Sequence, residues 1–127
     1  MPSAFAFAGY AGPNRGSLEI IGLSGLNLSS VTDMTNAFAC TNYLDVTGLK
    51  VNANANFSDV FATTKNAHGT ITFLGNPATY SQAFANSTND ADHVLTVNYT
   101  SAVTNIDSII ATRGNNEYIV KGTQVDN

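Results

Sequence analysis

Short apolar clusters recur along the chain at an almost fixed interval. Each cluster has apolar residues at positions i, i+3 and i+4, and the four clusters begin at Met34, Phe57, Tyr80 and Ile106. The residues four positions later are separated by 23, 23 and 26 residues, and they are Phe38, Phe61, Phe84 and Ile110. A period of roughly 20–50 residues predicts stacked repeats, in which each unit buries its apolar face against its neighbours.

Each cluster follows a segment with apolar residues at alternate positions, which is typical of a strand with one buried face. This pattern predicts strands over residues 21–28, 44–51, 70–74 and 95–99, and a closing strand over 118–120. Gly25 and Gly48 predict a turn or bulge within the first two segments, because glycine supplies backbone freedom that other residues lack.

The spacing within the clusters predicts a short helix after each of the first four strands. Asp33 and Asn56 precede the first two clusters, and we expect their side chains to cap these helices. With about eight residues each, the helices are expected to form only by packing on neighbouring coils.

The repeat divides the chain into an N-terminal arm or cap, residues 1–17, and one solenoid domain, residues 18–127. Parallel strands require crossovers of this length, so the expected fold is α/β: a short right-handed solenoid with a parallel sheet and short helices. We expect four coils and a closing strand, with bounds 18–42, 43–69, 70–93, 94–117 and 118–127.

Two segments depart from the period. The three extra residues of the third interval are placed in the loop at 86–93. The arm before residue 18 is apolar and off the pattern, and it is expected either to fold over the first coil or to reach into another subunit.

The first coil resembles the BspA-type leucine-rich repeat of bacterial surface proteins. Units of that family run through Ser-x-Val-Thr-x-Met-x-x-Met-Phe. The segment here begins Ser29-Ser30, and Val31, Thr32, Met34 and Phe38 match the pattern. Ala37 stands where Met is commoner. The resemblance spans roughly residues 18–111, and beyond the first coil it consists of little more than the apolar anchors. It implies a leucine-rich-repeat-like solenoid that serves adhesion or protein binding, without enzymatic activity or a cofactor.

Charged residues make up 11 % of the chain and apolar residues 43 %, with a formal net charge of −4. A typical soluble domain is about one-quarter charged, so Asn, Ser and Thr must supply most of the polar surface. Such a surface repels its neighbours weakly, which suits a protein that packs against others or against copies of itself. Five Lys and Arg leave no basic footprint for nucleic acid.

No apolar run approaches the roughly 20 residues of a membrane-spanning helix. The N-terminal residues lack the basic region and the long apolar stretch of a secretory signal peptide. If Met1 is the native start, the chain is expected to be made in a cytoplasm and not to leave by the general secretory route.

Residues with catalytic or metal-binding chemistry are few. Cys40 follows an apolar cluster and is interpreted as a small buried hydrophobe, with a catalytic thiol as the alternative. His68 and His93 have no nucleophile or carboxylate at a meaningful spacing. The segment 89–93 lacks the glycine and the distal acidic residue of a calcium loop, so a solvated loop is expected and a weak cation site is the alternative.

The aromatic residues of the clusters, Phe57, Phe61, Tyr80 and Phe84, are interpreted as core and not as a binding stripe. We therefore predict no catalytic, cofactor-binding or metal residues, and the binding residues stay unassigned.

Together these features favour a non-enzymatic structural or assembly protein, such as a capsid-decoration or tail component of a phage particle, which lysis would release without a signal peptide. The predicted partners are copies of the chain and a larger protein assembly, and the predicted location is a virion or an extracellular surface. The alternative is an adhesion or ligand-binding module of a bacterial surface protein, which the family resemblance favours.

Overall fold

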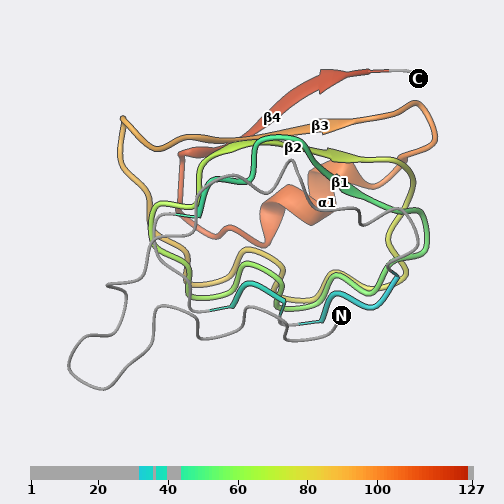
Figure 1. Cartoon of the computed structure of the whole chain (residues 1–127), viewed down its shortest axis with the longest axis horizontal. Coiled ribbons are helices and arrows are strands. Elements are labelled where there is room, and N and C mark those ends of the chain that lie inside the picture. The colour runs from blue at the N-terminus through green and yellow to red at the C-terminus, as the bar shows by residue number, and fades with distance from the viewer. Residues whose placement is uncertain (1–31, 36, 40–43, 126–127) are drawn as a thin grey trace.

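The computed structural model describes residues 32–35, 37–39 and 44–125 of the chain. The expected arm at 1–17, the expected strand at 21–28 and Cys40 lie outside the described residues. The described elements are β1 (Leu49–Val51), β2 (Gly69–Phe73), β3 (Leu95–Tyr99), α1 (Ile106–Ala111) and β4 (Ile119–Gln124). They wind through about three turns of a solenoid, with the strands stacked along one side (Figure 1).

The four strands form one parallel sheet in the order β1-β2-β3-β4. Leu49 pairs with Ile71, which pairs with Val97, so one inward-facing residue of each coil stands above the next. The predicted short α/β solenoid with a parallel sheet is confirmed. Strand β3 coincides with its predicted range, and β2 and β4 lie within one residue of their predicted starts.

Strand β1 is shorter than the predicted segment 44–51. The carboxylate of Asp45 accepts a hydrogen bond from the backbone N–H of Thr47 at 3.0 Å, which turns the chain. Gly48 follows with φ of 88°, a left-handed conformation that interrupts an extended strand. The turn predicted at Gly48 is therefore confirmed, and Asp45 is left in an isolated bridge with His68 of the next coil.

The side opposite the sheet is built from turns, and the helices predicted in the first three coils are wrong. We call this side the turn wall; it comprises the described residues of 33–39 and the segments 56–63 and 79–86. Its backbone N–H groups donate to the next coil at every second residue, with Phe57 to Thr79, Asp59 to Ser81, Phe61 to Ala83 and Thr63 to Ala85, at 2.8–3.0 Å. Hydrogen bonds between coils replace the bonds that a helix would make within itself.

Left-handed residues explain why these segments do not become helices. Asp59 and Gln82 occupy equivalent places in successive coils with φ of 58° and 55°, and Thr63 and Asn86 follow with 59° and 56°. A residue with positive φ ends a right-handed helical turn. The predicted cap at Asp33 is likewise a local turn, in which its carboxylate accepts from the N–H of Thr35 at 3.2 Å.

The helix predicted in the fourth coil is confirmed as α1. Its residues Ile106, Ile109 and Ile110 are buried, and the N–H of Ile109 donates to the carbonyl of Asn105. In Figure 1 the helix lies inside the outline of the earlier coils and not along their turn wall. Since a helix satisfies its own backbone groups, α1 can cover the apolar core without the hydrogen bonds between coils that the turn wall makes.

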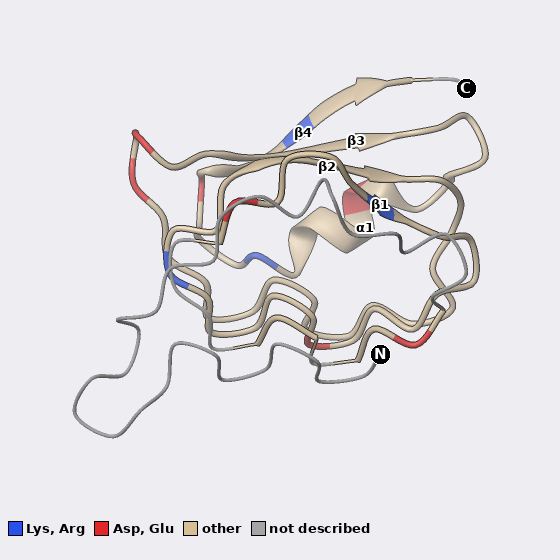
Figure 2. Cartoon of the chain, viewed as in Figure 1, with Lys and Arg blue, Asp and Glu red and all other residues tan. Residues whose placement is uncertain are grey.

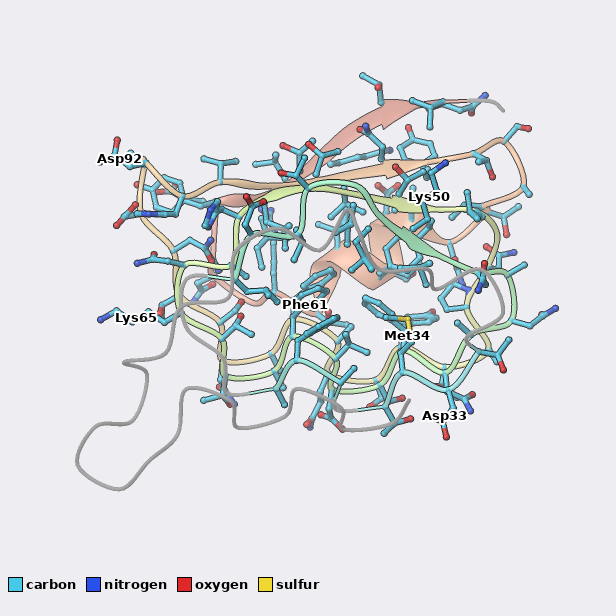
Figure 3. The ribbon with its side chains drawn as sticks, in the orientation of Figure 1. Asp33, Met34, Lys50, Phe61, Lys65 and Asp92 are labelled. Atoms are coloured by element: carbon cyan, nitrogen blue, oxygen red, sulfur yellow. The ribbon has the colours of Figure 1, made fainter. Side chains whose placement is uncertain are left out.

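The core lies between the sheet and the turn wall and is organised as ladders. Phe38, Phe61 and Phe84 are fully buried, and their rings stack at centroid distances of 5.6 Å in both intervals. Phe57 stands beside this stack and meets Phe73 of the sheet edge-on at 4.9 Å. Figure 3 shows Met34 and Phe61 pointing into this space, whereas Asp33, Lys65 and Asp92 point away from it. The interpretation of the cluster aromatics as core is confirmed for Phe57, Phe61 and Phe84, and Tyr80 packs partly buried against them.

The predicted insertion is found between the turn-wall segment of the third coil, residues 79–86, and β3. Lys65 bridges Thr88, an offset of 23, whereas Gly69 pairs with Leu95, an offset of 26. The three extra residues therefore lie between Thr88 and Leu95, which overlaps the predicted loop at 86–93.

Candidate functional site

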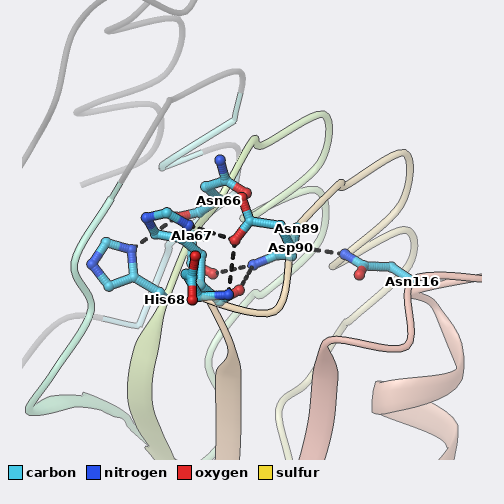
Figure 4. Close-up of polar contacts among 8 residues, drawn as sticks. Asn66, Ala67, His68, Asn89, Asp90 and Asn116 are labelled. Carbon is cyan, nitrogen blue, oxygen red and sulfur yellow. Dashed lines mark hydrogen bonds and ion pairs between the residues drawn. The ribbon is translucent and has the colours of Figure 1, made fainter.

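Polar side chains gather where the second, third and fourth coils turn back toward the sheet. We call this region the polar corner; its members are Asn66, His68, Ser87, Asn89, Asp90, His93 and Asn116. Figure 4 shows Asn66, His68, Asn89, Asp90 and Asn116 gathered there. They come from segments that lead into β2, β3 and β4, so the stacking of the coils brings together residues more than 20 positions apart. None of these segments is a helix or a strand, and side-chain hydrogen bonds supply many of the contacts between them.

Asn89 links three coils through its amide group. Its Nδ2 donates to the carbonyl oxygen of Ala67 at 2.6 Å and to that of His93 at 2.7 Å, and its Oδ1 accepts from Asn116 Nδ2 at 2.9 Å. The insertion loop is thereby tied to the coil before it and the coil after it. Side-chain amides suit this task because each carries donors and an acceptor.

Asn116 spans the gap between the third and fourth coils. Its Nδ2 also donates to Ser87 Oγ at 3.1 Å, and its Oδ1 accepts from the N–H of Tyr118 at 3.2 Å. Ser87 is buried, and its hydroxyl donates to the carbonyl of Phe84 at 2.6 Å. Every polar group of the Asn116 side chain thus serves to hold the corner together.

The two histidines meet at the polar corner, and one of them has a carboxylate partner. Their rings lie edge to face at 5.2 Å. His93 Nδ1 contacts Asp90 Oδ1 at 2.7 Å, so the prediction that no carboxylate stands at a useful spacing from His93 is wrong. This contact lowers the pKa of Asp90, because the ring hydrogen-bonds to the ionised carboxylate. His68 Nδ1 lies 2.8 Å from the carbonyl oxygen of Asn66.

The alternative of a cation site at 89–93 gains no support from this geometry. Asp90 uses one oxygen for both the His93 ring and the N–H of Asp92, and Asn89 turns its Nδ2 group toward the loop. Among the described residues, no three side chains of His, Cys, Asp or Glu converge on a point where they could hold a metal ion. The loop closes on itself through hydrogen bonds.

Beside the polar corner lies an open depression of about 530 Å³, lined by residues 86–89 of the third coil and 113–118 of the fourth. We call it the corner depression. It exists because the fourth coil does not continue the backbone ladder here. Thr88 donates to Thr64 and accepts from Asn66, both in the second coil. Alternate residues of an extended segment face opposite sides, so the backbone groups of Ser87 and Asn89 face the fourth coil. In the described structure the fourth coil reaches these two residues through the Asn116 side chain, which bonds to their side chains and not to their backbone groups.

Arg113 forms one wall of the corner depression. Its Nη1 donates to the carbonyl oxygen of Ile119 at 2.6 Å and lies 3.4 Å from that of Asn116. In the part of the chain that the structure describes, Arg113 has no ion-pair partner. Glu117 is exposed on the opposite side of the same turn, so the lining carries one positive and one negative charge.

Sequence reasoning missed the residues of the corner depression. The structure forms a turn over residues 113–116, with Gly114 at φ of 62°. The sequence signal for the depression was the longer interval between Phe84 and Ile110. It implies that the fourth coil cannot stay in register with the third. Figure 2 shows charged residues at scattered points of the ribbon, with no extended basic stretch along the described coils.

Comparison of the chain with protein-family models, with curated proteins and with solved structures finds no significant match. Among the described residues, no helix is long and apolar enough to cross a membrane.

Proposed function

We propose that the chain is a non-enzymatic structural or assembly protein that acts through protein–protein contacts, as a small component of a phage particle such as a capsid-decoration or tail protein. The observation that carries the proposal is the outer face of the sheet. Its rows run Lys50, Thr72, Asn98 and Thr70, Thr96, Val120 across neighbouring strands. All but one of these side chains are uncharged.

A face in whose two rows Lys50 is the one charged side chain can approach another protein with little unpaired charge to bury. The rest of the described surface offers weak repulsion, since only 11 % of the chain is charged. The proposed partners are copies of the chain and a larger protein assembly, and the proposed location is a virion or an extracellular surface.

Light scattering on the purified protein over a range of concentrations tests this proposal. We expect an oligomer whose mass falls in Thr96→Glu, because Thr96 lies between the uncharged Thr70 and Val120 and the substitution places a charge on the outer sheet face. Thr79→Glu is the matched control, since Thr79 is an exposed threonine on the turn wall, and its oligomer should persist. A monomer at every concentration, with no capture by purified particles, would contradict the assembly role. Repeating the measurement after deletion of residues 1–12 separates an exchanged arm from one that folds over its own first coil.

The second candidate is an adhesion or ligand-binding module of a bacterial surface protein, in line with the BspA-type resemblance of the first coil. The corner depression favours it, because it is an open cavity of ligand size that is lined largely by polar residues. Sequencing of the complete reading frame tests it: flanking secretion and anchoring segments would favour the adhesin, and a neighbourhood of particle genes would favour the assembly protein.

A further inference from the structure

We propose that the corner depression binds a neutral saccharide of one or two sugar rings. This site is separate from the outer sheet face that carries the assembly role, so the two proposals stand on different observations.

The first argument is the supply of hydrogen-bonding groups that the fold leaves open. The backbone N–H groups of Ser87 and Asn89 donate to no acceptor in the described part of the chain. Asn115 is exposed at the rim, and its side chain has no hydrogen-bond partner among the described residues. Thr88 and Asn86 add a hydroxyl and a second amide. A sugar hydroxyl both donates and accepts, so a surface that mixes amides, hydroxyls and backbone groups matches it.

The second argument is charge. Arg113 and Glu117 give the lining no net charge, and Arg113 already shares its Nη1 group with two backbone carbonyl oxygens. A phosphate or carboxylate drawn to Arg113 would also lie near Glu117, whose charge opposes that attraction. A neutral ligand can use both residues as hydrogen-bond partners for its hydroxyl groups.

The third argument is size and shape. A volume of about 530 Å³ falls within the range of roughly 300–1,000 Å³ that small-molecule sites occupy. Tyr118 is partly buried in the lining and offers a flat ring for the apolar face of a sugar, as amphipathic aromatic residues commonly do. Gly114 leaves room at the rim, since a Cβ placed there would meet no heavy atom within 4 Å.

Titration of the ¹⁵N-labelled full chain with neutral sugars tests the proposal. The probes are glucose, galactose, N-acetylglucosamine and maltose, with glucuronate and inorganic phosphate as charged comparators. We expect amide shift changes at 87–89 and 114–118, with a Kd on the order of 1 mM for at least one neutral sugar.

Two variants locate the binding. Thr88→Trp fills the corner depression and should abolish the shift changes, whereas Thr79→Trp should leave them unchanged. Both threonines are exposed and both take part in a bridge between coils, which makes them a matched pair. Asn115→Ala should weaken binding by roughly 3- to 10-fold, the effect of one lost hydrogen bond.

The proposal is overturned if no neutral sugar shifts these amides at about 100 times that Kd, if glucuronate or phosphate binds more tightly than every neutral sugar, or if Thr88→Trp binds as the parent does. The mass of Thr88→Trp by light scattering separates this result from the assembly role, because the variant leaves the outer sheet face intact.

Discussion

At the scale of single residues, the stacking of equivalent positions sets what each side chain must do. Phe61 lies between Phe38 and Phe84 with interplanar angles of 18° and 7°, so its ring contacts its own equivalents on both sides. The sequence alone places these residues in the core, because their spacing equals the repeat. It does not reveal that Thr63 must adopt a left-handed conformation, which a β-branched residue rarely does.

Thr63 and Asn86 give a reciprocal test of this conformation. They occupy equivalent places in successive coils, with φ of 59° and 56°. Asparagine tolerates the left-handed region better than threonine, so Thr63→Asn should stabilise the protein by about 0.5–1 kcal/mol and Asn86→Thr should destabilise it by a similar amount. Thermal unfolding followed by circular dichroism checks both changes. A lower Tm for Thr63→Asn than for the parent would mean that the threonine makes a stabilising contact of its own.

At the scale of elements, the strands followed from the sequence and three of the four helices did not. Apolar alternation predicted β2, β3 and β4, because each strand has one face on the core and one outside. The clusters at Phe57 and Tyr80 share their spacing with the cluster of α1, yet they form turns that bond to adjacent coils. Side-chain periodicity cannot tell the two apart, since both place the same anchors on one face.

Asparagine side chains hold the fourth coil where the backbone ladder fails. Asn76 exchanges hydrogen bonds with Thr104, with its Nδ2 donating to Thr104 Oγ1 at 3.1 Å and its Oδ1 accepting from the N–H of Thr104 at 2.9 Å. Asn116 does the same at the polar corner, and Asn98 accepts from the N–H of Thr123 beside β4. The abundance of asparagine, seen in the sequence only as a weakly charged surface, thus has a structural use at this joint.

Two glycines test how closely neighbouring coils approach. Gly69 opens β2 with φ of 107°, and a Cβ there would lie 2.6 Å from Thr47 Oγ1 and 2.9 Å from the Thr47 nitrogen. Gly114 has φ of 62° and open space around it. Gly114→Ala should therefore destabilise by about 1–2 kcal/mol through backbone strain alone, and Gly69→Ala by about 3 kcal/mol or more because overpacking adds to the strain. Urea unfolding of both variants measures the difference, and equal losses would show that the coils can separate at Gly69 without penalty.

At the scale of the whole molecule, the described end of the solenoid is closed. Helix α1 lies inside the outline of the coils (Figure 1). Arg113 Nη1 donates to the carbonyl oxygen of Ile119 in β4. Lys121 of β4 pairs with Asp107 of α1 at 3.1 Å. Lys121 is the one charged residue of β4, and a lysine on an edge strand discourages further strand pairing. Association through the outer sheet face, as proposed above, is therefore favoured over extension of the sheet at β4.

Stability of the whole molecule should depend on pH through its carboxylates. The N–H and hydroxyl of Thr47 hydrogen-bond to Asp45 and lower its pKa, and the His93 ring lowers that of Asp90. A carboxylate with a lowered pKa in the folded state contributes stability above its unfolded pKa, and this contribution is lost as the pH falls through the folded value. We expect Tm to change little between pH 7 and 5 and to fall below about pH 4.

Asp45→Asn isolates this effect. The variant should have a lower Tm than the parent at pH 7 and a shallower fall below pH 4. Asp92→Asn is the control, because the Asp92 carboxylate makes no hydrogen bond in the described structure, and its pH profile should follow that of the parent. If Tm falls with pH in the same way in all three proteins, the contact between Asp45 and Thr47 is not the cause of the pH dependence.

The sequence by itself determined the repeat, the parallel sheet and the core ladders, because each depends on which side chains are apolar and how far apart they stand. Tertiary structure decided the rest: whether a cluster forms a turn or a helix, that His93 meets His68, and that Asn89, Asn116 and Arg113 surround a depression. These outcomes depend on where backbone groups find their hydrogen-bond partners. For a stacked coil those partners lie about 23 residues away along the chain, beyond the reach of any local pattern.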